Sequence, residues 1–512
     1  MKTFFLNPTL AEQDQYIREG RCMQKAASWA TAWPPITLAT LAAIAQSKSE
    51  VKLIDGNVEP TTLQELLHRI EIFDPDLIVV NTGFPSIDND MAVAQKIKQT
   101  FPDIKLLAFG VYFTLLEKEA LDLHPYLDFG IAGEPEETFE ALLNFLSEDK
   151  WDYHLIQGLM YRDFTGVHVN LPRPFIQDLD QLPFPDRGLL KNERYRLPHN
   201  NHTYTLINIA RGCPYPCTYC IVNPYYGRKV RKHSVDYVIR EMKECMDRYG
   251  VQEFLFWDEV FTLDRDFALA ICEAMMKNNL STRWAATTRV GLLDEVLLGA
   301  MKKAGCYLLG LGVESASQEI LNNVKKKQTV EEIKRAVALC KKAGIQTMGH
   351  FIFGLPGETE ETAENTIRFM KRLGLDYMQS YCAVPYPKTE FGELAKEKGW
   401  IGVNRWSQYD FGGTSIVNIG TISPERVTHF REKAFRSFYF RPFYLLRKIF
   451  GQLSISQWFR LLNFKDWMNS RKERQVHGNG SKCCDPLSER GENDSDLRSE
   501  GARCASSPKS SR

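Results

Sequence analysis

Three cysteines near the middle of the 512-residue chain have the spacing of a metal-binding loop. Cys213, Cys217 and Cys220 belong to the segment RGCPYPCTYC, a C-x3-C-x2-C pattern that directly follows a predicted strand. Thiolates this close together can converge on one soft metal centre, and two prolines and a glycine favour a non-helical wrap of the backbone. A four-iron cluster held by only three cysteines keeps one iron open to an outside ligand. Such a site can therefore do chemistry as well as carry electrons.

A structural zinc site is the alternative interpretation of the same cysteines. Zinc sites of that kind take four protein ligands and usually pair two C-x2-C knuckles. The nearest further ligand is His233, which stands thirteen residues after Cys220. We therefore favour an iron–sulfur cluster over zinc.

The composition is that of an ordinary globular protein and excludes several functions. Lysine plus arginine number 64, as do aspartate plus glutamate, so no global charge attracts nucleic acid or anionic lipid. No apolar run reaches the ~18 residues that span a bilayer, and the first residues lack the pattern of a signal peptide. We therefore expect a cytoplasmic protein whose twelve cysteines do not form structural disulfides.

The elements that must position the cysteines fall into two α/β regions. In residues 1–150 short strand-like and helix-like runs alternate, which predicts a doubly wound, flavodoxin-like parallel sheet covered by helices. Such sheets bind ligands at the loops that leave the carboxyl ends of the strands. Gly83, Gly110 and Gly133 stand at such exits, either in tight turns or as part of a ligand platform. The predicted strands are 3–6, 51–54, 77–81, 104–109 and 129–132.

The second region predicts a barrel. A proline-rich stretch at residues 151–200 indicates a linker without packed elements. Residues 201–390 then alternate six strands with amphipathic helical runs, which predicts a partial (β/α)6 barrel whose working face lies at the carboxyl ends of its strands. The cysteine loop leaves the first of these strands. The predicted barrel strands are 205–209, 253–257, 283–288, 307–313, 347–353 and 376–383.

The C-terminal part predicts a helical region at residues 391–470 and a disordered tail at residues 471–512, which has too little apolar content to fold. The aromatic and basic stretch 438–450 either packs against the barrel or lies peripherally on a membrane surface, and we favour packing. We expect no nucleic-acid partner, because no recognised binding module accompanies this stretch.

The cysteine loop resembles the signature of radical S-adenosylmethionine (SAM) enzymes, and motifs in the expected order at successive strand ends support the resemblance. It implies a [4Fe-4S] cluster at the three cysteines whose open iron binds SAM. Asp258 and Glu259 would accept hydrogen bonds from the methionine amino group, and Glu314 would contact the ribose. The other residues for which the resemblance implies contacts with the bound cofactor are Tyr219, Arg289, Ile352 and Gly354.

Each of these motifs has a plainer alternative when it is taken alone. Asp258 and Glu259 could begin a turn, Glu314 could cap a helix, and the GLPGE segment at residues 354–358 could be a tight βα loop. Arg289 could form a surface salt bridge instead of pairing with the SAM carboxylate. Their joint order behind a three-cysteine loop favours the functional interpretation.

The first α/β region, placed before such a barrel, resembles the cobalamin-binding members of the superfamily, which include methyltransferases and the anaerobic magnesium-protoporphyrin ester cyclase. The resemblance implies that the nucleotide tail or corrin of cobalamin lies near Thr82, Gly83, Gly110, Gly133 and Glu134. No D-x-H-x-x-G motif occurs, so the histidine that replaces the lower cobalt ligand in other cobalamin proteins is missing. Several members of this group also lack it, and cobalamin is therefore still expected.

The resemblance implies an enzyme that cleaves SAM to a 5′-deoxyadenosyl radical and transfers a methyl group from cobalamin to an unactivated carbon. Radical oxidation or ring closure is the alternative within this class. A methylthiotransferase would carry a second cysteine triad before the barrel, where only Cys22 stands. A cobalamin-binding sensor with an inactive barrel is the alternative from a different class. The expected partners are a small-molecule substrate such as a lipid or tetrapyrrole and a flavodoxin or ferredoxin-type electron donor.

Overall fold

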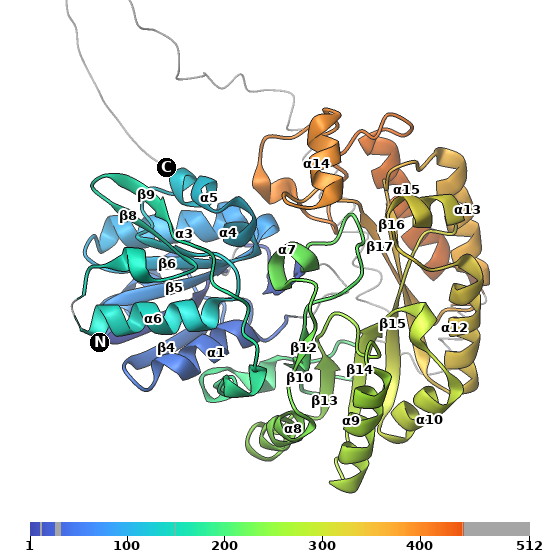
Figure 1. Cartoon of the computed structure of the whole chain (residues 1–512), viewed down its shortest axis with the longest axis horizontal. Coiled ribbons are helices and arrows are strands. Elements are labelled where there is room, and N and C mark those ends of the chain that lie inside the picture. The colour runs from blue at the N-terminus through green and yellow to red at the C-terminus, as the bar shows by residue number, and fades with distance from the viewer. Residues whose placement is uncertain (11–12, 26–31, 149, 443, 445–512) are drawn as a thin grey trace, which may run out of the picture. The chain divides into compact units, whose positions relative to one another are not determined.

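Two largely parallel sheets organise the part of the chain that the structure describes (Figure 1). In this computed structural model the described residues are 1–10, 13–25, 32–148, 150–442 and 444. All of them belong to one compact unit. No helix among them is long and apolar enough to cross a membrane.

The N-terminal sheet has the strand order β4-β1-β5-β6-β7-β8-β9. Its first five strands are parallel, which confirms the predicted doubly wound, flavodoxin-like sheet. β5 is buried at every position because helices cover both faces of the sheet, and parallel strands of this kind have near-continuous apolar sequences. The strands are β1 (Lys2–Asn7), β4 (Glu50–Asp55), β5 (Leu77–Thr82), β6 (Lys105–Gly110), β7 (Phe129–Ile131), β8 (Leu159–Asp163) and β9 (Gly166–Val169).

Among the described residues, two helices cover one face of this sheet and four cover the other. α1 (Ile36–Ala45) and α6 (Pro135–Ser147) share one hydrophobic core with the strands. A second core lies on the opposite face. The helices of that face are α2 (Leu63–Phe73), α3 (Ile87–Thr100), α4 (Val111–Leu116) and α5 (Lys118–Leu123), and the 3-10 helix η1 (Phe84–Ser86) precedes α3.

An antiparallel hairpin after β1 was not predicted from the sequence. Strands β2 (Tyr16–Glu19) and β3 (Cys22–Lys25) pair with each other in a separate two-stranded sheet. The hairpin carries polar and charged residues at buried positions, so it lacks the apolar alternation by which a short strand is recognised.

The second sheet is the predicted partial barrel, with six parallel strands in the order β10-β13-β14-β15-β16-β17. Along β16 the odd-numbered residues, such as Phe351 and Phe353, are fully buried against the helices, whereas His350 and Ile352 face the half-open interior. The strands are β10 (Tyr204–Ile207), β13 (Glu253–Phe256), β14 (Arg283–Thr288), β15 (Cys306–Glu314), β16 (Gln346–Phe353) and β17 (Tyr377–Cys382).

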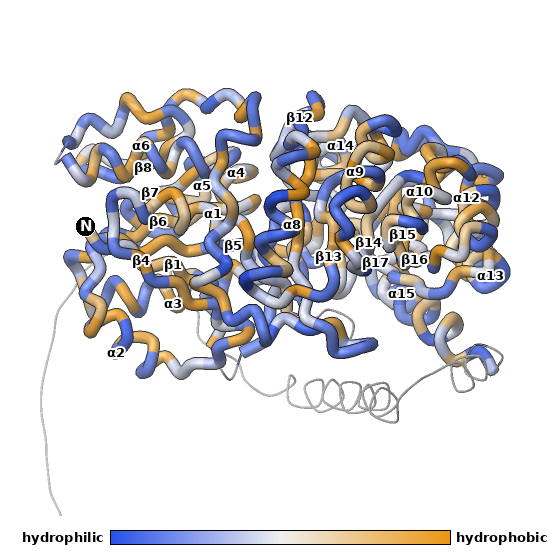
Figure 2. Tube along the Cα trace, turned by 90° about the horizontal axis from the view of Figure 1, so that it is seen from below, coloured by the Kyte–Doolittle hydropathy of each residue, from blue (hydrophilic) through white to orange (hydrophobic). Residues whose placement is uncertain are grey.

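Amphipathic helices surround the outside of the barrel, and hydrophilic and hydrophobic residues alternate along them (Figure 2). The helices and strands of the barrel also contain four buried core thiols, as predicted. They are Cys245, Cys272, Cys306 and Cys340. The helices are α8 (Val235–Tyr249), α9 (Arg265–Lys277), α10 (Glu295–Lys303), α11 (Gln318–Asn323), α12 (Val330–Lys342) and α13 (Glu360–Arg372), and the 3-10 helix η6 (Val290–Leu292) follows β14.

Residues 151–200 differ from the prediction of a linker without packed elements. β8 and β9 extend the N-terminal sheet, with β8 antiparallel to β7 and β9 antiparallel to β8. Arg187, only 1% exposed, donates to Glu241 of α8 at 2.7 Å. Tertiary contacts of this kind hold the segment in place. Because it has no periodic apolar pattern, the sequence does not reveal that it packs. Its 3-10 helices are η2 (Tyr153–Leu155), η3 (Leu179–Gln181), η4 (Arg187–Leu189) and η5 (Asn192–Arg194).

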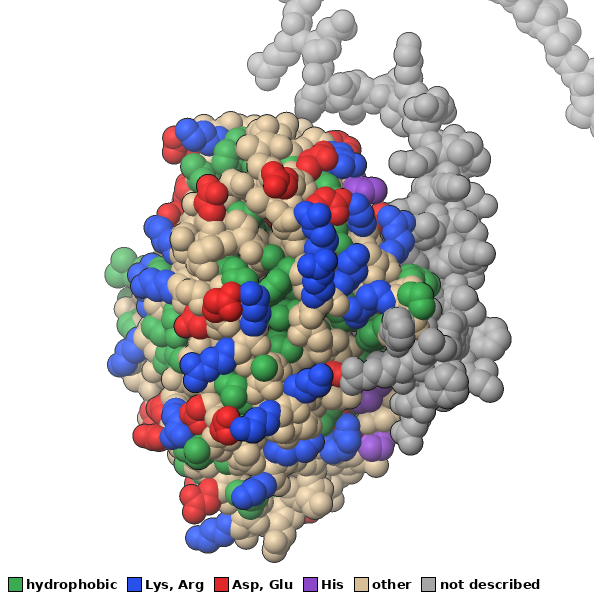
Figure 3. Space-filling view, turned by 90° about the vertical axis from the view of Figure 1, so that its right-hand side faces the viewer, with side chains coloured by type: hydrophobic (Ala, Val, Ile, Leu, Met, Phe, Trp, Pro, Cys, Tyr) green, Lys and Arg blue, Asp and Glu red, His purple; other side chains and the backbone are tan. Residues whose placement is uncertain are grey.

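The region after the barrel contains α14 (Glu390–Glu397), η7 (Trp406–Gln408) and α15 (Pro424–Tyr439). Phe438 is fully buried and the Tyr439 hydroxyl donates to the carbonyl of Met378, so the described part of the stretch 438–450 packs against β17. The rest of that stretch and the predicted tail at residues 471–512 lie outside the described residues. The face shown in Figure 3 carries both basic and acidic side chains, and several basic ones lie beside one another.

Candidate active site at the carboxyl ends of the barrel strands

The cysteine loop is closed by a short ribbon and held by backbone hydrogen bonds. Strands β11 (Ala210–Arg211) and β12 (Arg231–Lys232) pair on either side of it, and helix α7 (Val222–Tyr226) lies within it. Gly212 has φ +93°, and a Cβ there would lie 2.4 Å from the carbonyl oxygen of Lys229, so only glycine fits. The Cys213 amide donates to Gly227 at 3.2 Å. These contacts define the wrap that the prolines and glycine predict.

All three loop cysteines are half-buried free thiols. Burial raises the pKa of Cys213 and raises that of Cys220 to about 12, with a further contribution from neighbouring Cys217. Because thiolates are the ligands of metals, a positively charged metal centre is what would compensate three such groups. No three His, Cys, Asp or Glu side chains in the described ranges converge on a single ion. A four-iron cluster does not require this, since each cysteine binds a different iron.

Arg289, which follows β14, lies directly against the cysteine loop. Its Nη1 is 3.7 Å from the sulfur of Cys217, and its guanidinium carbon is 3.7 Å from the ring centroid of Tyr215. Nη2 donates to the carbonyl of Lys326. Arg289 is only 6% exposed, so the alternative of a surface salt bridge is wrong.

Two adjacent carboxylates, those of Asp258 and Glu259, follow β13, and among the described residues Arg21 is the cation beside them. The Nε of Arg21, at the tip of the β2–β3 hairpin, lies 2.5 Å from Glu259. Asp258 is 2% exposed, and neither of its carboxylate oxygens has a hydrogen-bond partner among the described residues. Burial, and secondly the charge of Glu259, raises the pKa of Asp258 well above its usual range. The pair therefore has room for one more cationic or hydrogen-bond-donating group.

Glu314 ends β15 in the left-handed region, with φ +63°, which is rare for a non-glycine residue and typical of functional sites. Its carboxylate lies 2.5 Å from Nζ of Lys326, and both side chains are more than nine-tenths buried. Lys326 also lies 3.3 Å from the Tyr219 hydroxyl. The sequence did not single out Lys326, because the run of Lys325, Lys326 and Lys327 resembles a solvated charge cluster and only burial distinguishes its middle member.

β16 and β17 place a row of hydrogen-bonded polar side chains on the interior face of the barrel. The sequence analysis did not single out this row either. His350 Nδ1 lies 3.2 Å from the Tyr381 hydroxyl, which donates to the Gln379 side chain. Burial lowers the pKa of His350 to about 4, so the ring is neutral at pH 7. Ile352 is on the same interior face, and Gly354, with φ +87°, lies against Val427 of α15.

At the ends of β5 and β6 the structure brings together three of the residues predicted to border cobalamin. Thr82 Oγ1 donates to Phe109 at 2.8 Å, the Gly83 amide donates to Ser86, and a Cβ on Gly110 would lie 2.2 Å from the Thr82 carbonyl oxygen. Gly133, after β7, faces open space, since no described atom lies within 4 Å of a Cβ built there.

Glu134 is placed differently from those residues. Its carboxylate binds Arg211 and Arg231, which flank the cysteine loop, and it also accepts a hydrogen bond from the amide of Ile176 at 2.9 Å. It therefore faces the barrel ribbon rather than the ends of β5 and β6.

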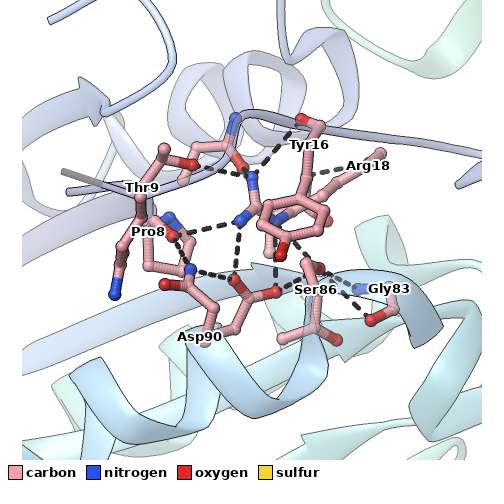
Figure 4. A network of polar contacts seen from close by, with 12 residues as sticks. Pro8, Thr9, Tyr16, Arg18, Gly83, Ser86 and Asp90 are labelled. Carbon is pink, nitrogen blue, oxygen red and sulfur yellow. Dashed lines mark hydrogen bonds and ion pairs between the residues drawn. The ribbon is translucent and has the colours of Figure 1, made fainter. Parts of the chain in front are cut away.

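A buried polar network occupies the exit of β1, where the missing histidine motif would stand (Figure 4). Arg18 of the hairpin is 5% exposed and lies 2.7 Å from Asp90. It also donates to Ser86, Thr9 and the carbonyl of Pro8. The network anchors the hairpin to the carboxyl end of the N-terminal sheet, and the sequence pattern did not identify it.

The comparisons with known proteins agree with this architecture. Residues 207–370 match the family model of the radical SAM superfamily, and residues 26–143 match that of the B12 binding domain. An uncharacterized methyltransferase of Pyrococcus horikoshii is 32% identical over 420 residues, 82% of this chain and 91% of the relative. The anaerobic magnesium-protoporphyrin IX monomethyl ester cyclase of Rubrivivax gelatinosus is 30% identical over 387 residues, 74% of this chain and 69% of the relative.

Solved structures share the fold. The radical SAM methyltransferase TsrM from Kitasatospora setae, with cobalamin and a [4Fe-4S] cluster bound, gives a TM-score of 0.63 at 19% identity, over 79% of this chain and 76% of that one. The cobalamin-dependent SAM radical enzyme OxsB gives 0.61 at 18% identity, over 80% and 57%. A six-stranded partial barrel with a three-cysteine loop, preceded by a B12-type sheet, defines a class of radical enzyme. The chain belongs to the radical SAM superfamily, in the group that also carries a B12 binding domain.

Proposed function

We propose that the protein is a cobalamin-dependent radical SAM methyltransferase that acts on an unactivated carbon of a small molecule. The observation that carries the SAM site is the Asp258–Glu259 pair, in which a buried carboxylate has no partner among the described residues. A buried charge without a partner is costly, and the α-ammonium of SAM is a group that would compensate it. Relatives named as methyltransferases support methyl transfer.

The residues around the cysteine loop fit the other parts of SAM. Cys213, Cys217 and Cys220 would hold the [4Fe-4S] cluster. Arg289 and Lys326 bring two buried cations to the same region, where a carboxylate would meet them. Glu314, which pairs with Lys326, would accept the ribose hydroxyls. When bound, the cluster and SAM would supply a carbon-centred radical and cobalamin the methyl group.

The described residues at the N-terminal sheet fit a cobalamin without a histidine ligand. The first histidine of the chain is His68, whose side chain is 67% exposed beside Glu71. His124 lies between the hydroxyls of Tyr112 and Tyr126. We infer that the β1 exit offers cobalt no imidazole. The open space at Gly133 and the edge at Thr82, Gly83 and Gly110 would border the cofactor.

Substrate, electron donor and location complete the proposal. The interior line of His350, Gln379 and Tyr381 offers hydrogen bonds to a polar group of a small-molecule substrate, which includes tetrapyrroles and lipids with polar head groups. A one-electron donor of the flavodoxin or ferredoxin type would reduce the cluster, and we infer a cytoplasmic location. Radical oxidation or cyclisation is the second candidate function, because the Rubrivivax relative bears the name of a cyclase.

The experiment begins with anaerobic reconstitution using iron, sulfide and hydroxocobalamin, followed by gel filtration and measurement of bound iron and cobalt. Dithionite and SAM are then added, and 5′-deoxyadenosine and S-adenosylhomocysteine are measured by mass spectrometry. A C213A/C217A/C220A variant is the control for adventitious iron. Iron, cobalt and both products support methyl transfer. Iron without cobalt overturns the cobalamin mechanism, 5′-deoxyadenosine alone favours oxidation, and absence of both products favours a sensor.

A further inference from the structure

The ribbon that closes the cysteine loop carries two arginines at paired positions. Arg211 of β11 is opposite Arg231 of β12, and the loop between them contains all three cysteines. The two residues are 9% and 4% exposed. Like charges directly opposite on an antiparallel pair are destabilising, and burial increases that cost. The ribbon therefore needs carboxylates from elsewhere to stay closed.

Those carboxylates come from the N-terminal sheet. Glu134 precedes α6 and Glu136 lies in its first turn; they are 5% and 1% exposed. Arg231 Nη1 lies 2.8 Å from each carboxylate oxygen of Glu134. Arg211 donates to Glu134 at 3.3 Å and to Glu136 at 2.7 Å. Two glutamates thus neutralise two arginines in a buried network between the two sheets.

Further hydrogen bonds fix the geometry of this network. Arg231 also donates to the carbonyls of Ile176, at 2.8 Å, and Tyr226, at 2.9 Å, the latter within the cysteine loop itself. Its guanidinium carbon lies 4.9 Å from the ring centroid of Phe175. Charge-assisted hydrogen bonds in a buried setting are stronger and more specific than exposed ones. By contrast, the ion pair of Lys388 and Glu117, which also joins the two α/β regions, is solvent-exposed. Each of its side chains is 42% exposed.

We propose that Glu134 and Glu136 are positioning residues that hold the cysteine loop in its cluster-binding conformation, so that the N-terminal sheet sets the geometry of the iron–sulfur site. This inference rests on the proposed function, since it presumes a cluster at the three cysteines. It gives the Gly133–Glu136 loop a task other than contact with cobalamin. The loop of the B12-type sheet that faces the barrel then acts on the cluster through two arginines.

The test uses the full chain with the substitutions E134Q and E136Q. E137Q is the matched control, because Glu137 is on the same helix but its side chain is 43% exposed and lies 3.6 Å from Arg173. Each protein is reconstituted anaerobically with iron, sulfide and hydroxocobalamin and passed through gel filtration. Iron and cobalt are then measured, and the reduced cluster is examined by electron paramagnetic resonance with and without SAM.

We expect E134Q to retain less than about half of the wild-type iron, because neutralising one partner leaves a buried arginine uncompensated beside the loop. Its residual signal should broaden or shift, and its cobalt content should match that of the wild type. E137Q should behave as the wild type. If Glu134 acts through Arg231, the double variant E134Q/R231Q loses no more iron than R231Q alone.

Folding is checked by near-ultraviolet circular dichroism. Should E134Q not fold, R231K carries the test, because lysine keeps the charge but cannot reproduce the forked hydrogen bonds, and it should fold while losing iron. Wild-type iron and an unchanged signal in folded E134Q or R231K would overturn the proposal, as would loss of cobalt with iron intact. Failure of the wild type itself to bind iron would instead contradict the proposed function.

Discussion

The Nη1 nitrogen of Arg289 lies 3.7 Å from the sulfur of Cys217. A guanidinium next to a cluster ligand favours the more negative, reduced form of an iron–sulfur cluster. Because Arg289 is buried and stacked on Tyr215, water does not weaken this effect as it would at the surface. In the proposed site, Arg289 would therefore affect the redox potential of the cluster as well as meet the SAM carboxylate.

We expect R289M to lower the reduction potential of the cluster by roughly 60 mV or more, which corresponds to about 1.4 kcal/mol for one electron. A redox titration followed by electron paramagnetic resonance measures this. R265M is the control, since Arg265 pairs with Asp294 at the exposed start of α9. A potential equal to that of the wild type would mean that Arg289 does not act on the cluster.

Replacement of Asp258 should change the affinity for SAM without lowering the stability of the protein. D258N should weaken SAM binding to the reconstituted protein by about tenfold or more, because it removes a carboxylate that lacks any other described partner. Without SAM, the free energy of unfolding should not fall, since a buried carboxyl group without a described hydrogen-bond partner has been removed. Equilibrium dialysis with labelled SAM and denaturant unfolding measure the two quantities. D266N, at a fully solvated position of α9, is the control. Unchanged SAM affinity in D258N would exclude Asp258 from the SAM site.

The buried pair of Lys326 and Glu314 should be sensitive to loss of the lysine. K326M leaves the Glu314 charge uncompensated in a site that is more than nine-tenths buried, so we expect the free energy of unfolding to fall by about 3–5 kcal/mol. K325M breaks an exposed pair with Glu390 and should cost under about 1 kcal/mol. Urea titration of the cluster-free proteins gives both values. Equal effects of the two substitutions would contradict the burial assigned to Lys326.

Glu19 should make stability depend on pH. Burial raises the pKa of its carboxyl from 4.5 to about 7, although hydrogen bonds from Thr37 and the charge of Arg211 act in the opposite direction. Between these values the folded state holds a proton that the unfolded state has released. Stability due to Glu19 is thus fully present below pH 4.5 and is lost as the pH rises through 7, by about 3 kcal/mol in total.

We therefore expect E19Q to gain stability over the wild type between pH 5 and pH 8.5. The two free energies of unfolding, measured on cluster-free protein across this range, should diverge as the pH rises. The difference isolates the contribution of Glu19 from that of the rest of the protein. A difference that does not vary with pH would show that the carboxyl titrates normally.

The strands were predictable because parallel strands covered on both faces are continuous apolar runs. Leu77 to Thr82 is buried throughout, and no polar spacing competes with a strand at that position. The cysteine loop was predictable for a different reason, namely that its ligands are neighbours in the chain. The roles of the individual SAM-contacting and cobalamin-contacting residues stay predictions.

The hairpin, Lys326 and the role of Glu134 depend on contacts that a sequence does not display. Arg18 is buried only because Asp90, 72 residues away, neutralises it. Glu134 stands in a glycine-containing loop that is typical of a ligand platform, but two arginines on another sheet occupy its carboxylate. Polar residues of this kind become buried through partners far along the chain. The local sequence pattern around such a residue therefore does not indicate that it is buried.

The tip of the β2–β3 hairpin also bears on how the chain folds as it leaves the ribosome. Arg18 has its partner at Asp90 as soon as α3 is made, so strand β2 can settle early. Arg21, by contrast, donates to the carbonyl of Asp258, 237 residues further on, and stacks on Trp257 at 4.5 Å. A two-stranded ribbon is marginal by itself, and long-range contacts form late. The contacts of this tip with the residues that follow β13 therefore form only after the first barrel strands have been synthesised.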